Sequence, residues 1–336
     1  MSAIQKIVAL GFPWQTSDPF LFCAYHEDQY PKGNSNMGPD ADFSGRLLGQ
    51  DFDPHHSWRM YHGKEVPGFP AHPHLGFETV TIVEQGLVDH SDSLGAAARF
   101  GNGDVQWITT GKGLQHSEMF PLLNEKEENP LLLFQIWLNL PRASKNVPPY
   151  FQMLWQEDIP VVTLTDKHMH NVSLKLICGA YKEHQGAQPN PDSWAADPAN
   201  GVAIWLIKLE PNAEFELPEA DETVNRSLYY FKGKEIQADG YHIPVKHEIR
   251  LDPSKSITLH NGTETSCFLF LQGKPINEPV IQQGPFVTNS VGEIKEAMLR
   301  YHKDQFGGWP WPKHDNVHQR NKGRFAILPN GSEIIK

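Results

Sequence analysis

Apolar residues in this chain recur in short runs separated by Gly, Pro, Asn and Asp, and amphipathic helical patterns are almost absent before the C-terminal end. Runs of this kind are typical of β-strands. The expected strands are at 20–25, 77–84, 87–91, 105–109 and 131–139 in the first half, and at 173–178, 202–209, 227–231, 247–251, 256–259 and 265–271 in the second. The pattern therefore predicts an all-β protein.

One helix is predicted near the C-terminus. Ser290 and Glu293 have the spacing of a capping box, and Ile294, Ala297, Met298 and Tyr301 follow at helical intervals. Gly307 and Gly308 would end this helix. The remaining tail, which is rich in Trp and Pro, is expected to pack as an arm on the body of the protein.

The length of 336 residues favours two domains, because single hydrophobic cores rarely grow this large. A turn-rich segment at 141–149 interrupts the strand pattern, and we place the domain boundary there. The prediction is an N-terminal domain at 1–145 and a C-terminal domain at 146–336 that includes the helix and the tail.

Composition narrows the class of protein. The net charge of -11 argues against a broad grip on nucleic acid, which requires clustered Lys and Arg. Three separated cysteines, Cys23, Cys178 and Cys267, indicate neither a disulfide framework nor a thiolate metal site. The longest apolar stretch, at 130–140, is about half of the ~20 residues that a membrane-spanning helix needs. We expect a cytoplasmic protein without a membrane anchor.

Two short segments carry candidate metal ligands. Side chains two apart on a strand share a face, so His72 and His74 would point together, as would His116 and Glu118. Three nitrogens and one oxygen meeting in a barrel would hold a divalent metal and leave coordination positions open, which is typical of catalytic sites. Such ligands suit Fe(II), Mn(II), Ni(II), Cu(II) or Zn(II).

The residues of these segments and their spacing resemble those of the pirin family of cupins. The resemblance rests on His72-Pro-His-Leu-Gly-Phe-Glu-Thr-Val-Thr81, on Asp89-His-Ser-Asp-Ser-Leu-Gly95, and on the run from Gly103 to Met119 that contains Gly111, Gly113 and His116-Ser-Glu118. The segments Trp137-Leu-Asn-Leu-Pro141 with Pro148-Pro-Tyr150, and Gly284-Pro-Phe-Val-Thr-Asn289, resemble the family's inter-domain and C-terminal segments. The likeness is strong over 70–150 and weak over 150–280.

The resemblance implies two cupin barrels face to face, with iron in the N-terminal barrel and no metal in the C-terminal one. It assigns the metal ligands to His72, His74, His116 and Glu118. It also implies one of two functions. The first is an Fe(II)-dependent dioxygenase of the quercetin 2,3-dioxygenase type, acting on a small aromatic hydroxylated substrate, with Glu118 as both ligand and catalytic base. The second is a non-enzymatic iron and redox sensor that binds a transcription factor or a metabolic enzyme.

Other residues have less support as site residues. His168 and His170 have the same spacing but no glycine-flanked partner motif, so we interpret them as a surface or strand-edge pair; His55 and His56 would point to opposite faces of a strand. Glu78 is expected to have a structural or supporting role. For Gln115 a polar contact beside the metal stays open. The aromatic residues Phe69, Phe77, Trp107 and Phe120 could line a substrate pocket but more often fill a core.

Overall fold

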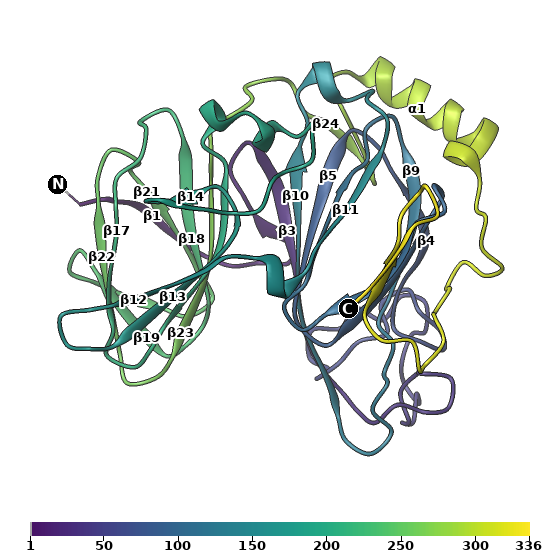
Figure 1. Cartoon of the computed structure of the whole chain (residues 1–336), viewed down its shortest axis with the longest axis horizontal. Coiled ribbons are helices and arrows are strands. Elements are labelled where there is room, and N and C mark those ends of the chain that lie inside the picture. The colour runs from purple at the N-terminus through teal and green to yellow at the C-terminus, as the bar shows by residue number, and fades with distance from the viewer. Residues whose placement is uncertain (1) are drawn as a thin grey trace. The chain divides into compact units, whose positions relative to one another are not determined.

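The structure is a computed structural model that describes residues 2–336 and consists of two compact units (Figure 1). The first unit comprises the chain up to Cys23 together with Glu157–Asn277, and the second comprises Ala24–Gln156 together with Glu278–Lys336. Each unit has its own hydrophobic core. The two are described separately.

The second unit contains two antiparallel sheets. Their strands are β3 (Phe20–Tyr30), which begins in the first unit, β4 (Gly68–His74), β5 (Phe77–Gln85), β6 (Leu87–Asp92), β7 (Ala97–Gly101), β8 (Val105–Thr109), β9 (Leu114–Met119), β10 (Asn129–Asn139), β11 (Tyr150–Leu154), β26 (Phe325–Ile327) and β27 (Glu333–Ile335). One sheet has the order β11-β8-β5-β10-β3 and the other β27-β26-β7-β6-β9-β4. Phe100 and Leu114 from one sheet and Ile108 and Leu133 from the other share a buried core, so the sheets pack face to face.

The first unit has the same kind of architecture. Its strands are β1 (Ile4–Ala9), β2 (Trp14–Gln15), β12 (Val161–Thr165), β13 (Asn171–Cys178), β14 (Ala180–Tyr181), β15 (His184–Gln185), β16 (Ala203–Leu209), β17 (Glu214–Leu217), β18 (Asn225–Lys232), β19 (Glu235–Ala238), β20 (Tyr241–Pro244), β21 (His247–Leu251), β22 (Ile257–Asn261) and β23 (Ser266–Gly273). The sheets β1-β21-β18-β23-β16-β13-β12 and β17-β22-β19-β20 enclose a core that includes Trp205, Phe268 and Phe270. Large apolar side chains thus fill this barrel.

The C-terminal helix forms as the sequence predicts. Helix α1 (Val291–Asp304) has Ser290 as its N-cap, and the Ser290 hydroxyl accepts a hydrogen bond from the backbone N–H of Glu293 at 3.3 Å. Short 3₁₀ helices are η1 (Arg142–Ser144), η2 (Gln156–Asp158), η3 (Trp194–Ala196), η4 (Pro198–Asn200) and η5 (Gln305–Gly307), and a small hairpin joins β24 (Ile281–Gln283) to β25 (Phe286–Thr288). None of the helices among residues 2–336 has the length and apolar character needed to cross a bilayer.

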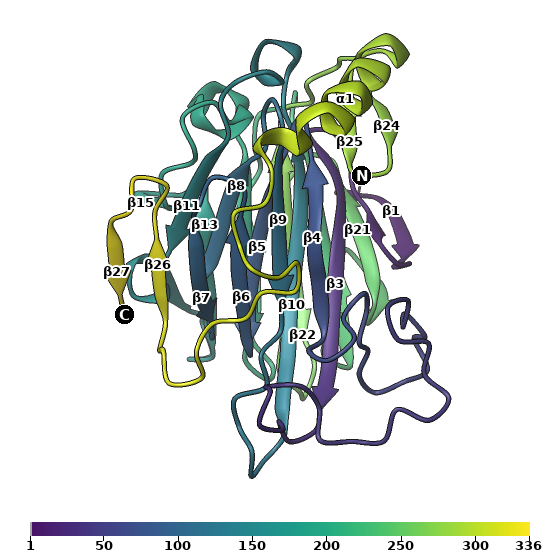
Figure 2. The ribbon, with the colours of Figure 1, turned by 90° about the vertical axis from the view of Figure 1, so that its right-hand side faces the viewer.

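The tail after α1 packs along the second unit, as expected. Strand β26 pairs with β7, with Ala326 opposite Ala98, and β27 then pairs with β26 (Figure 2). Closer to the helix, the Trp311 indole N–H donates to the backbone oxygen of Asp92 at 2.7 Å. The tail therefore extends the sheet that contains β9 and β4. Strands β26 and β27 were not predicted from the sequence.

The compact units differ in outline from the predicted domains. The N-terminal strand β1 pairs with β21, with Ile7 opposite Ile249, which places it in the first unit. Helix α1 contributes Ile294 and Ala297 to a buried cluster with Leu75 and Phe286 in the second unit. Each unit is therefore built from two stretches of chain, whereas the predicted domains at 1–145 and 146–336 are continuous. The domain assignment itself stays a prediction.

Glycines shape the turns around the candidate site. Gly111 and Gly113 have φ of +47° and +115°, which favours glycine over other residues. A Cβ at Gly111 would lie 2.2 Å from the backbone oxygen of Val147, so the close approach of two chain segments also excludes a side chain there. These turns set where β9 begins.

Candidate metal centre

Strands β4 and β9 place the predicted ligands on facing positions. They pair antiparallel, with His72 directly opposite His116, and the register shifts between Phe69 and His72. Because side chains alternate along a strand, His74 shares the face of His72, and Glu118 shares the face of His116. The antiparallel pairing therefore places the two predicted pairs on neighbouring strands.

The three imidazole rings converge. One ring nitrogen each from His72, His74 and His116 lies within 4.8 Å of the other two, and among residues 2–336 this is the group of His, Cys, Asp and Glu side chains that could hold a metal ion. The Nε2 atoms of His72 and His116 are 3.1 Å apart. Two adjacent ligands on one ion at ~2.1 Å have about this separation.

Hydrogen bonding selects the tautomer of His72. Its Nδ1 lies 2.9 Å from the backbone oxygen of Pro70. A carbonyl oxygen can only accept, so Nδ1 carries the proton and the lone pair of Nε2 is left for the centre of the group. Metal-bound histidines are commonly oriented by a carbonyl in this way.

Burial keeps the rings neutral. Desolvation lowers the pKa of His72 to about 4 and lowers the pKa values of His74 and His116 well below their usual range. The Nε2 atom of His74 and the Nδ1 atom of His116 are buried and have no hydrogen-bond partner among the described residues. Buried polar atoms without partners are costly. Neutral rings, with the Nε2 atom of His74 left without a partner, fit a cation between them.

Glu118 lies next to this group. Its Oε2 atom is 3.6 Å from Nε2 of His116. Burial raises the pKa of Glu118, while hydrogen bonds from Gln135 and Thr81 oppose that rise. The ligand roles of the three histidines and of Glu118, and the catalytic role of Glu118, stay predictions.

Glu118 accepts hydrogen bonds from two residues that were not predicted from the sequence. The amide nitrogen of Gln135 donates to Oε2 at 2.7 Å, and the hydroxyl of Thr81 donates to Oε1 at 3.3 Å. Both residues lie on the opposite sheet, on β10 and β5, where they pair directly. The available signal was Gln135 itself, a polar residue inside the long apolar run at 130–140.

His90 is a further buried histidine near the site. Its ring centroid is 5.6 Å from that of His116, and its Nε2 atom lies 3.2 Å from Oδ2 of Asp92. On β6, His90 pairs with Glu118 and Asp92 with His116. The spacing of His90 and Asp92 resembles that of the ligand pairs, which is the signal that could have identified them.

The remaining candidates lie elsewhere. Glu78 is buried and accepts a hydrogen bond from Thr109 at 2.6 Å, which agrees with a structural role. The amide nitrogen of Gln115 donates to the backbone oxygen of Gln305 at 2.8 Å, so this side chain anchors the tail. The structure therefore shows Gln115 in contact with the tail, and not the contact beside the metal that the sequence left open.

Of the four aromatic candidates, three fill the core. Phe77, Trp107 and Phe120 are buried, whereas Phe69 is partly exposed. The Phe69 ring centroid lies 6.3 Å from that of His72. Among the four, Phe69 is thus the one that is both near the histidine group and partly exposed.

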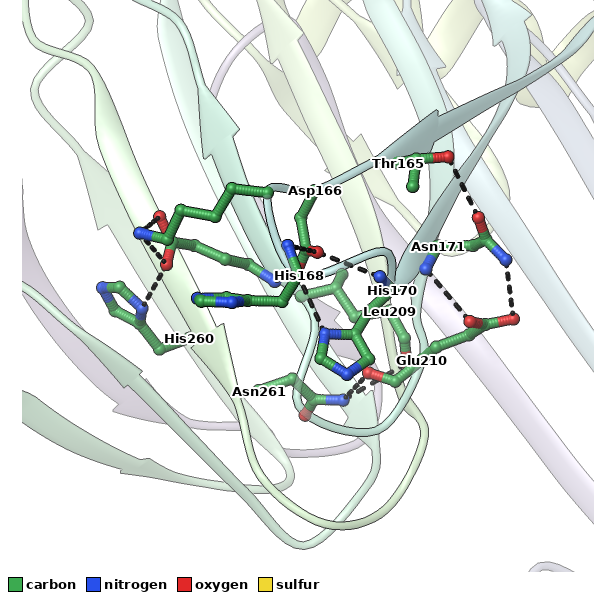
Figure 3. A network of polar contacts seen from close by, with 11 residues as sticks. Thr165, Asp166, His168, His170, Asn171, Leu209, Glu210, His260 and Asn261 are labelled. Carbon is green, nitrogen blue, oxygen red and sulfur yellow. Dashed lines mark hydrogen bonds and ion pairs between the residues drawn. The ribbon is translucent and has the colours of Figure 1, made fainter.

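The second His-x-His pair behaves as a surface pair. His168 and His170 lie on the turn between β12 and β13 in the first unit, and Nδ1 of His170 is 3.3 Å from Oδ2 of Asp166 (Figure 3). Asp166 also accepts the backbone N–H of both histidines, at 2.7 and 2.9 Å. Its carboxylate organises the turn. Neither this pair nor His55 and His56 belongs to the group that could hold a metal.

Comparison with known proteins gives two family matches. Residues 5–138 match the Pirin family model, and residues 204–307 match the model of the Pirin C-terminal cupin domain. A pirin-like protein of Solanum lycopersicum is 33% identical over 262 residues, which cover 76% of this chain and 83% of that protein. Pirin of Mus musculus is 31% identical over 278 residues, which cover 78% and 86%.

A match to a solved structure agrees with the family matches. A quercetin 2,3-dioxygenase from Acinetobacter baumannii aligns with a TM-score of 0.72 at 27% identity, covering 92% of this chain and 99% of that one. The predicted fold class, an all-β protein with two cupin domains and a C-terminal helix, is confirmed.

Proposed function

Because the chain belongs to the pirin family of two-domain cupins, we propose that it is an Fe(II)-dependent dioxygenase that cleaves a flavonol-like or other hydroxylated aromatic substrate. The observation that carries the proposal is the convergence of three neutral, buried imidazoles, of which His72 has its ligating nitrogen selected by Pro70. The name of the Acinetobacter baumannii neighbour supports the choice of reaction.

His72, His74 and His116 would hold the ion. A divalent metal with open coordination positions supplies Lewis acidity for a hydroxylated substrate and a place where dioxygen can react. We choose iron by family resemblance, since the nitrogen ligands alone would also suit Mn, Ni, Cu or Zn.

The protein's own groups would prepare the substrate. Glu118 is a buried acceptor whose Oε2 atom is 3.6 Å from Nε2 of His116, and it is placed to take the proton of a substrate hydroxyl. Phe69, partly exposed beside His72, would contact the aromatic ring of the substrate. The buried residues Phe77 and Trp137 stack behind His74 with ring centroids 3.9 Å apart and exclude water from that side.

The test is anaerobic purification with metal analysis, followed by dioxygen uptake with quercetin and other catechol-like compounds. We expect about one iron per chain and substrate-dependent uptake, both lost in His74→Ala and both retained in the control His168→Ala. Iron-loaded protein that consumes no dioxygen with any of these substrates would remove the enzyme proposal. Such a result, together with metal-dependent binding of a protein partner, would favour the sensor.

A further inference from the structure

Arg226 points into the barrel of the first unit. It is the second residue of β18, and Leu228 and Tyr230, two and four positions later, belong to the buried core of that barrel. Because side chains two apart on a strand share a face, the Arg226 side chain points inward as well. Only 4% of its surface is exposed. The chain just before β18 is exposed at 221–223, so the guanidinium lies at an end of the barrel.

The charge of Arg226 has no counterion among residues 2–336. Its Nη1 atom donates to the backbone oxygen of Pro218 at 2.8 Å, and its Cζ atom lies 5.4 Å from the centroid of the Phe270 ring. Its Nε atom is buried and has no hydrogen-bond partner in the described chain. Burial lowers the pKa of Arg226 to about 10, which leaves the group charged at neutral pH. A buried charge with one neutral partner is costly to keep.

A second arginine of this chain shows what the free edge of Arg226 would bind. In the second unit, Nε and Nη2 of the buried Arg99 each donate to one carboxylate oxygen of Asp89 at 2.7 Å. Arg226 has the same two atoms on the same edge of its guanidinium, and its hydrogen bond to a described residue uses Nη1 instead. A carboxylate on that edge would accept the two parallel bonds that Asp89 accepts from Arg99.

The chemistry of this edge favours a small carboxylate over other ligands. One guanidinium neutralises one negative charge, and its planar edge offers two donors to two coplanar oxygens. A phosphate dianion would bring a second charge that Arg226 alone does not neutralise. Water would accept a hydrogen bond but would leave the charge unpaired. Phe270, with the Trp205 ring centroid 4.7 Å from its own, places aromatic surface beside the guanidinium.

We propose that Arg226 anchors a binding site for a small carboxylate at the end of the barrel in the first unit. The site is independent of the proposed function, because the histidine group belongs to the second unit and Arg226 to the first. It gives a binding role to the barrel that is expected to hold no metal. It also accounts for a buried charge that the first unit does not need for its stability.

The test is carboxylate binding by the full-length chain after dialysis against a chelator, so that no ion at the histidine group can take up the probe. Saturation-transfer NMR at constant ionic strength would follow formate, acetate and benzoate, with phosphate and chloride as competitors. We expect saturable binding of at least one carboxylate, with weak displacement by phosphate and chloride. Arg226→Met should lower the affinity at least about 10-fold, because it removes two charge-assisted hydrogen bonds.

Two further variants make this loss specific. Arg226→Lys keeps the charge but not the planar edge, so it should bind the carboxylate more weakly than wild type and without preference over chloride. This variant also serves if Arg226→Met does not fold. Lys208→Met, at an exposed position on β16 in the same sheet, should keep the wild-type affinity. The bound carboxylate should raise the Tm of wild type and of Lys208→Met but not that of Arg226→Met.

The outcomes bear on this site alone. Wild type without saturable binding of any of the three carboxylates would overturn the proposal, as would folded Arg226→Met and Arg226→Lys proteins with the wild-type affinity. Tighter binding of phosphate than of every carboxylate would overturn the ligand class. A failure of dioxygen uptake would remove the enzyme proposal and leave Arg226 untouched, because the carboxylate is measured on metal-free protein.

Discussion

Arg99 and Asp89 form a buried two-pronged ion pair in which Nε and Nη2 of the guanidinium each donate to one carboxylate oxygen at 2.7 Å. The same guanidinium donates to the backbone oxygens of His318, Gln319 and Lys322 in the tail, at 3.0, 2.9 and 2.7 Å. The pair therefore joins strands β6 and β7 to a segment more than two hundred residues later in the chain.

Replacing Arg99 with Met should strongly destabilise the second unit. The change leaves Asp89 buried without its ion-pair partner and frees four tail carbonyls, those of His318, Gln319, Arg320 and Lys322. Loss of one member of a buried pair costs about 3–5 kcal/mol. Urea unfolding would measure the loss, and limited proteolysis should show faster cleavage at 316–327. Lys322→Met, which removes a half-exposed pair with Glu333, should cost less than about 1 kcal/mol. Equal effects of the two variants would contradict this account.

Lys145 should make stability depend on pH in the alkaline range. Its Nζ atom donates to the backbone oxygen of Gly76 at 2.8 Å and to Oδ1 of Asn139 at 2.7 Å, and burial lowers its pKa from 10.5 to about 8. Between these two values the unfolded chain binds more protons than the folded one, so the free energy of unfolding from this group rises with pH. Below the folded pKa, the cost of burying the charge is present in full.

The check is urea unfolding of wild type and Lys145→Met at about pH 7, 8.5 and 10. The stability of wild type relative to the variant should increase by about 2–3 kcal/mol over this range. The same comparison with the exposed lysine variant Lys295→Met should give a difference that does not change with pH. A flat difference for Lys145 would mean that its charge is not disfavoured in the folded state.

Metal removal should destabilise the protein only while the histidine group is intact. An ion that binds the folded state raises its stability, so dialysis against a chelator should lower the Tm of wild type and of His168→Ala. His74→Ala should bind near zero metal and show no Tm change on chelation. Metal analysis and thermal unfolding, both measured on the same samples, would test these expected Tm changes. Retention of one ion per chain by His74→Ala would contradict the site.

Arg226→Met should leave the stability of the first unit at the wild-type value or raise it. Arg226 is 4% exposed, donates to the backbone oxygen of Pro218 at 2.8 Å and lies over the Phe270 ring, with no carboxylate partner among the described residues. Burial lowers its pKa to about 10, so the charge is disfavoured. We expect a gain of about 1 kcal/mol in urea unfolding.

The exposed Lys167, which pairs with Glu214, provides the comparison, since Lys167→Met should change stability by less than about 1 kcal/mol. A clear loss of stability in Arg226→Met would mean that the contacts with Pro218 and Phe270 outweigh the cost of burying the charge.

The sequence by itself determined part of the strands, the C-terminal helix, and which candidate ligand side chains share a face. Strands β8 (Val105–Thr109) and β21 (His247–Leu251) have the predicted bounds, because alternation and flanking turn residues are local signals. Helix α1 begins after Ser290 for the same reason. The shared faces of His72 with His74 and of His116 with Glu118 follow from the period of a strand alone.

Only the tertiary structure decided which groups meet across strands. Three contacts join residues that are far apart in sequence. They are the pairing of His72 with His116, the hydrogen bond from Gln135 to Glu118, and the hydrogen bond from Gln115 to the tail. Periodicity gives the face of a residue but not its partner. The pairing of β1 with β21 and of β26 with β7 depends in the same way on sheet edges that no local pattern encodes.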